Sequence, residues 1–99
     1  MARLKRLIVP QLPHLVQQRV VAGCEGLSDA VDQQAFVLAL RHCCDEHDVA
    51  VIAYALLNQQ TQLLLIPPSA ESLGKMVQAL TRQFVGPYNR RHQRSGALW

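Results

Sequence analysis

The sequence is poor in aromatic residues and cysteine, and it has no long apolar run. Only two Phe, two Tyr and one Trp occur in 99 residues, too few for an aromatic sheet that stacks RNA bases. Three cysteines cannot build a disulfide framework, which indicates a reducing compartment. No apolar stretch reaches the roughly 18–20 residues of a membrane span. Leu7–Val9, just before Pro10, is too short for a signal peptide. With no repeat or linker either, we expect one cytoplasmic domain without a membrane segment.

Charge is distributed unevenly along the chain. The net charge is +3, yet all seven acidic residues lie within residues 25–71, while residues 1–24 and 72–99 contain basic residues and no acid. This separation of positive from negative charge favours a basic surface that binds a polyanion. Charged helix ends exposed to solvent would give the same pattern. The candidate nucleic-acid contacts are the basic residues of the two ends: Arg3, Lys5, Arg6, Arg19, Lys75, Arg82, Arg90, Arg91 and Arg94.

The first half of the chain predicts a strand followed by a helix. Residues 14–21 follow two prolines and are rich in β-branched valine, which favours a strand. Ser28 has the position of an N-cap, with carboxylates in the turn that follows, and the helix is expected over about residues 28–47. The expected apolar stripe of this helix is Val31, Ala35, Leu38 and Cys43.

The second half predicts a hairpin followed by a second helix. Residues 49–57 (VAVIAYALL) are uniformly apolar and predict a buried central strand, and residues 61–66 predict the next one. Their short polar link favours an antiparallel pair. Ser69 and Ser72 are candidate N-caps of a helix that Pro87 is expected to break or kink. The expected apolar stripe of this helix is Leu73, Met76, Val77, Leu80 and Phe84.

The order strand–helix–strand–strand–helix predicts an α+β fold. We expect a ferredoxin-like or RRM-like sandwich, in which an antiparallel sheet has its helices on one face and leaves the other face open for a site. Gly96–Trp99 is a candidate for the start of a further strand.

Three segments carry a family resemblance. They are PHLVQQR at residues 13–19, YALLNQQTQLLLIP at residues 54–67 and NRRHQRSGALW at residues 89–99. Together they resemble the single-tyrosine HUH transposases, especially the REP-associated tyrosine transposases. The likeness covers essentially all 99 residues but only the N-terminal part of a family domain. It therefore implies a single transposase-like domain over residues 1–99, truncated at its C-terminus relative to the family.

The resemblance implies DNA binding without catalysis. Family members bind hairpin-forming single-stranded DNA, hold Mg²⁺ or Mn²⁺ with a His-hydrophobic-His motif and attack a phosphodiester with a tyrosine. Gln60 and Gln62 stand at the two histidine positions, and neutral amides bind such cations weakly. The family's nucleophilic tyrosine belongs to a helix beyond the position of Trp99, and neither Tyr54 nor Tyr88 matches it. We expect no catalytic residue, no bound metal and no other cofactor.

Two other features have ordinary structural explanations. Residues 41–48 (RHCCDEHD) are dense in metal-ligand types but lack the spacing of a zinc site, so a solvated helix end with half-buried thiols is favoured. Both tyrosines are expected to pack in the core. His14, which matches a family histidine, is expected to be structural or close to a phosphate.

Three alternative functions stay open at this point. The chain could be a ferredoxin-like module that forms dimers and binds a ligand or a protein without any role in nucleic-acid binding, since exposed edge strands would let two copies pair. A partner subunit could supply the missing catalytic groups. The chain could also be a remnant without a selected function.

Overall fold

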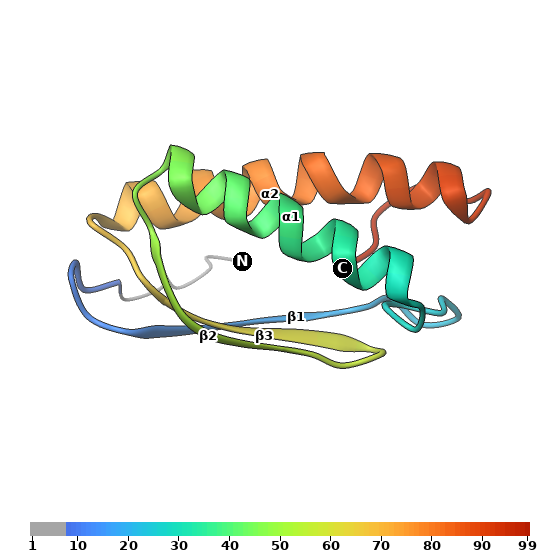
Figure 1. Ribbon diagram of the computed structural model, residues 1–99, viewed down its shortest axis with the longest axis horizontal. Coiled ribbons are helices and arrows are strands. Elements are labelled where there is room, and N and C mark those ends of the chain that lie inside the picture. Colours follow the sequence, from blue (N-terminus) through green and yellow to red (C-terminus); the bar gives the residue numbers. More distant parts are fainter. Residues whose placement is uncertain (1–7) are drawn as a thin grey trace, which may run out of the picture.

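The computed structural model describes residues 8–99, which form three strands and two helices. In chain order they are β1 (His14–Arg19), α1 (Ala30–Glu46), β2 (Ala50–Leu56), β3 (Gln60–Ile66) and α2 (Ala70–Arg91). The strands form one antiparallel sheet, and both helices cover the same face of it (Figure 1). This arrangement confirms the predicted α+β fold of the ferredoxin-like kind. Neither helix in the described part of the chain combines the length and hydropathy that a bilayer span requires.

The centre of the sheet is β3, and the prediction of a buried central strand over residues 49–57 is wrong. Within residues 8–99 the strand order is β1-β3-β2, so β2 pairs with a described strand on one side only. The first five residues of β2 are exposed, whereas β3 alternates between half-buried and buried positions. Uniform apolarity identified residues 50–56 as a strand, but it could not specify how many neighbours that strand has.

The first helix is shifted in phase from its prediction. Its N-cap is Asp29 rather than Ser28, and the Asp29 carboxylate accepts a hydrogen bond from the Asp32 backbone N–H. Val31 and Leu38 are exposed, so the expected stripe was wrong at these two positions. The buried residues of α1 are Asp32, Phe36, Leu40, Cys43 and Cys44. Because Asp32 is a charged residue in the buried stripe, the apolar pattern alone indicated the wrong face of the helix.

The second helix confirms its predicted N-cap and apolar stripe, in which Val77 is only partly buried, but it does not break at Pro87. Ser69 is the N-cap and accepts a hydrogen bond from the Ser72 backbone N–H. The helix continues past Pro87 to Arg91 instead of ending there. An internal proline costs a helix about 3 kcal/mol, but the next residue, Tyr88, is fully buried and anchors the last turn. Tertiary contacts therefore hold the helix beyond the proline.

An aromatic cluster joins the two helices to the end of the chain. The rings of Phe36 and Phe84 meet edge to face with centroids 5.2 Å apart, and the Trp99 ring stacks on Phe84 at 5.8 Å. Gly96–Trp99 does not form a strand, although the Leu98 carbonyl accepts a hydrogen bond from the Val21 N–H at 2.7 Å. The predicted core position of Phe84 is thus confirmed, and Phe36 of α1 is buried with it.

Candidate nucleic-acid interface

The side of the sheet opposite the helices carries a group of amides beside one arginine. Thr61 and Leu63 of β3 are buried beneath the helices, so the alternating Gln60 and Gln62 face the open side. In the register of β1 with β3, Gln17 lies opposite Gln62 and Arg19 lies opposite Gln60. We call Gln17, Arg19, Gln60 and Gln62 the amide face. Its residues offer hydrogen-bond donors, acceptors and one positive charge on a single surface.

The β2–β3 hairpin fixes one end of the amide face. The Gln59 side-chain amide donates to the carbonyls of Cys24 and Glu25, both at 3.2 Å. The Asn58 carbonyl accepts from the Leu27 N–H at 2.9 Å, and the Gln59 carbonyl accepts from the Val20 N–H at 2.8 Å. The hairpin tip is therefore bound to the loop after β1, which holds the ends of both strands together.

The other basic candidates lie away from the amide face. Lys75, Arg82 and Arg90 are exposed on α2, which belongs to the helical layer. The Lys75 ammonium lies 2.8 Å from the Glu71 carboxylate, and this hydrogen bond lowers the pKa of Glu71. Arg3, Lys5 and Arg6 lie outside the described residues. The fold thus does not gather the described basic residues into one patch.

Arg91 and Arg94 make intramolecular contacts that the sequence did not reveal. Arg94 donates to the Asn89 side-chain oxygen at 2.6 Å and to the Ala97 carbonyl at 3.0 Å. Arg91 donates through Nε and Nη2 to one carboxylate oxygen of Asp32, at 3.0 and 2.7 Å. Both guanidinium groups thus have a structural role at the end of α2 and in the segment after it. Their contact with DNA stays a prediction.

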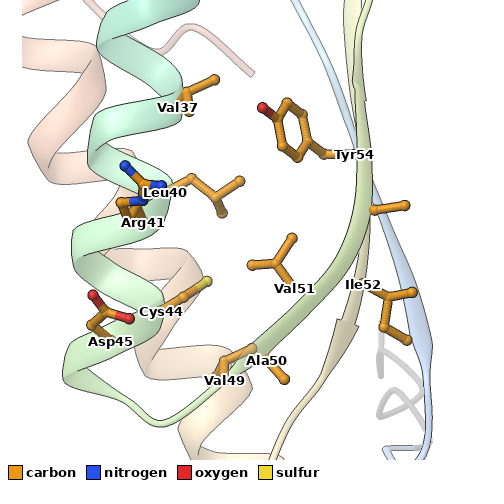
Figure 2. A pocket seen from close by; sticks show the side chains of 11 residues that line it. Val37, Leu40, Arg41, Cys44, Asp45, Val49, Ala50, Val51, Ile52 and Tyr54 are labelled. Carbon is orange, nitrogen blue, oxygen red and sulfur yellow. The ribbon is translucent and has the colours of Figure 1, made fainter.

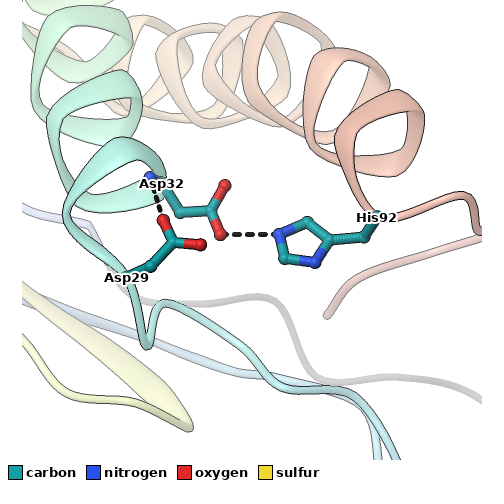
Figure 3. Close-up of side chains that lie close together, drawn as sticks. All are labelled: Asp29, Asp32 and His92. Carbon is teal, nitrogen blue, oxygen red and sulfur yellow. Dashed lines mark hydrogen bonds and ion pairs between the residues drawn. The ribbon is translucent and has the colours of Figure 1, made fainter.

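Asp32 is the buried centre of a partly exposed ion-pair cluster. Its second carboxylate oxygen lies 2.6 Å from His92 Nε2 (Figure 3). The His92 ring in turn stacks on Tyr88 with centroids 4.1 Å apart. The cluster, which we call the Asp32 clamp, consists of Asp32, Arg91 and His92 and fastens the start of α1 to the end of α2. Arg91 and His92 follow Asp32 by 59 and 60 residues in the sequence. Because the contacts join residues so far apart, no local sequence pattern indicated the clamp.

In the Asp32 clamp the carboxylate is already paired with Arg91 and His92, which argues against a cation site there. Asp29, Asp32 and His92 are, within residues 8–99, the one group of three metal-ligand side chains whose atoms lie within 4.8 Å. However, the Asp32 carboxylate already accepts from a guanidinium, and the Asp29 carboxylate caps α1. A cation here would have to compete with the adjacent positive charge of Arg91.

The two tyrosines have different environments, and neither belongs to the amide face. Tyr88 is fully buried, its hydroxyl donates to the Gly26 carbonyl at 2.8 Å, and burial raises its pKa. Its predicted role in packing is confirmed. Tyr54 was also expected in the core, but it is 49% exposed and lies in the edge strand β2. It points towards α1 (Figure 2).

Cys43, Cys44 and His14 make contacts within the fold that explain them without a ligand. Cys43 and Cys44 were expected to be half-buried, but both are buried because they lie on the core side of α1. Burial raises both pKa values, that of Cys44 to about 11. These thiols stay protonated at neutral pH and are poor metal ligands. His14 uses both ring nitrogens within the chain: Nε2 accepts from the Val9 N–H at 3.0 Å, and Nδ1 donates to the Leu12 carbonyl at 2.7 Å. Of its two expected roles, this geometry favours the structural one.

Sequence comparison gives no independent identification. No family model matches the chain, and no curated protein matches it either.

Proposed function

We propose that this protein is a transposase-like DNA-binding domain of the single-tyrosine HUH kind, which binds hairpin-bearing single-stranded DNA and does not cleave it. The observation that carries the proposal is the amide face, where Gln60 and Gln62 share one open surface with Gln17 and Arg19. Glutamine amides can hydrogen-bond base edges, and an arginine can pair with a phosphate. An unpaired loop or strand would present both groups to this surface.

Two features support binding without cleavage. Amides replace the imidazoles that would hold a divalent cation in the family that the sequence resembles, and they cannot gain affinity by deprotonation. Neither tyrosine of the chain faces Gln60 and Gln62: the Tyr88 hydroxyl is bonded inside the core, and Tyr54 points to the helical side. The placement of Tyr54 and Tyr88 therefore supports binding without a phosphotyrosine intermediate.

Arg19→Ala is expected to weaken binding of a hairpin-bearing single strand about 5- to 10-fold. Losing one phosphate contact should also reduce the slope of log affinity against log salt by about 0.7. The measurement is fluorescence anisotropy of a labelled DNA hairpin titrated with protein at several salt concentrations. Arg82→Ala is the matched control, because it removes the same charge from an exposed position on α2.

The control decides which surface binds. We expect Arg82→Ala to change affinity less than twofold. Equal losses for Arg19→Ala and Arg82→Ala would contradict binding at the amide face. A covalent protein–DNA adduct formed with Mg²⁺ or Mn²⁺ would contradict the absence of cleavage.

A further inference from the structure

A shallow apolar pocket lies next to the amide face, on the side of the sheet away from both helices (Figure 1). It has a volume of about 180 Å³ and is lined by Leu15, Ala53 and Leu64 among others. In the register of the sheet Leu64 of β3 lies opposite both Leu15 of β1 and Ala53 of β2, so the three side chains form a row across the strands. The surface is hollow here because β2 contributes only the short side chains of Ala53 and Ala55.

The pocket suits an uncharged planar ring. Leu15 is 60% exposed, so a ligand that covers it removes a large apolar area from water. Among the described residues, none that lines the pocket is charged, so a phosphate gains no counter-charge there. The volume also lies below the roughly 300–1,000 Å³ of pockets for drug-sized ligands. The occupant is therefore limited to about one ring system.

Gln62 brings a hydrogen-bonding group to the edge of this pocket. It lines the pocket together with the apolar residues, and Gln17 lies opposite it on β1. Neither side-chain amide makes a hydrogen bond to another residue in the described part of the chain. By contrast, the neighbouring Gln18 accepts a hydrogen bond from the Thr61 hydroxyl at 3.3 Å. The fold thus uses Gln18 internally and leaves the amides of Gln17 and Gln62 for a ligand.

A nucleobase matches this combination of groups, and adenine matches it best. A glutamine amide presents a donor beside an acceptor, and adenine presents the complementary pair N6–H and N7. Guanine presents two acceptors, N7 and O6, on the same edge and pairs with a cation instead. A purine covers more of the apolar surface than a pyrimidine does. Arg19 lies two residues beyond Gln17, about 7 Å along β1, where it can meet an adjoining phosphate.

We propose that this pocket is a base-binding subsite, which takes an unpaired adenine of the DNA strand. The ring lies on Leu15 and Leu64, N6–H donates to the side-chain oxygen of Gln62, and N7 accepts from its side-chain nitrogen. The inference rests on the function proposed above and adds a preference for one base to it.

The test is fluorescence anisotropy with a labelled DNA hairpin that carries a short single-stranded tail of deoxyadenosine, thymidine or deoxycytidine. The wild-type protein is expected to bind the deoxyadenosine tail at least about fivefold more tightly than the other two, because only this tail offers the bidentate pair on a purine. A tail of deazaadenine, in which a carbon atom replaces N7, should lose this advantage. Equal affinity for all tails, or an advantage that deazaadenine keeps, overturns the proposal.

Gln62→Leu is expected to bind every tail with the same affinity, since it keeps the apolar surface and removes the amide. Gln34→Leu is the matched control, because it makes the same change at an exposed glutamine of α1 and should keep the preference. Circular dichroism establishes that each variant folds. A preference for deoxyadenosine that survives in folded Gln62→Leu overturns the proposal, and the wild-type comparison of tails decides by itself if this variant does not fold.

A second measurement separates failure of the subsite from failure of the proposed function. Deoxyadenosine monophosphate is titrated into the isotope-labelled protein while NMR follows the side-chain amide signals of Gln62. We expect these signals to shift, and to shift far less with thymidine monophosphate. Hairpins that bind equally well with every tail overturn the subsite alone. Shifts at Gln62 without any hairpin binding support the subsite and overturn the proposed function, and the absence of both overturns both.

Discussion

Gly26→Ala is expected to destabilise the fold by about 3–5 kcal/mol, since strain and overlap occur together at this position. Gly26 has a φ of +71°, and a Cβ added there would lie 1.8 Å from the Asn58 carbonyl oxygen. That oxygen belongs to the hairpin tip and also accepts from the Leu27 N–H. Its retreat would break the contact that holds the hairpin against the loop after β1. Urea unfolding followed by Trp99 fluorescence measures the loss.

Gly23→Ala is the control that separates the cost of steric overlap from the cost of a left-handed backbone conformation. Gly23 has a similar φ of +83° with no atom within 4 Å of an added Cβ. A left-handed alanine costs about 1–2 kcal/mol, so the loss at Gly23 should be confined to that amount. Equal losses at the two glycines would show that the contact with Asn58 has no part in stability.

Asp32→Ala is expected to cost about 3–5 kcal/mol, because it removes the buried acceptor of the Asp32 clamp and leaves its cationic partner without a counter-charge. The Asp32 side chain is 1% exposed, and that of Arg91 is 31% exposed. Solvent at Arg91 should therefore place the loss towards the lower end of this range. The measurement is the free energy of unfolding of Asp32→Ala, Arg91→Ala and the double variant.

The double variant and a nearby carboxylate provide the controls. If the clamp couples the helices, the double variant should lose less than the sum of the two single losses. Asp29→Ala removes only the N-cap of α1 and should cost about 1 kcal/mol. An additive double variant, or an Asp32→Ala loss no larger than that of Asp29→Ala, would contradict a coupled clamp.

Local patterns in the sequence predicted the elements of the fold but not all of their neighbours. The predicted stripe of α2 recurs with a helical period: Leu73, Met76, Leu80 and Phe84 are buried, and its fifth member, Val77, is partly buried. The same reasoning misplaced α1, where the buried Asp32 interrupts the apolar stripe. It also could not distinguish a strand with two neighbours from one with a single neighbour, so β2 was expected at the centre of the sheet.

The candidate site was predictable to a similar degree. Alternation along a strand is a local property, so the sequence could place Gln60 and Gln62 on one face. It could not predict the register that brings Arg19 opposite Gln60, because strand pairing joins residues far apart in the chain. Nor could it distinguish free arginines from those bound within the molecule. Arg91 has no local partner, and its acceptor lies at the start of the other helix.

The central claim is that the amide face binds hairpin-bearing single-stranded DNA. Its most direct test is an anisotropy titration of a hairpin-bearing single strand against a strand of equal length and composition that cannot form a hairpin. We expect tighter binding of the hairpin strand, with an affinity that falls steeply as salt is raised. Failure to bind either strand at low salt, or equal affinity for both, would contradict the claim.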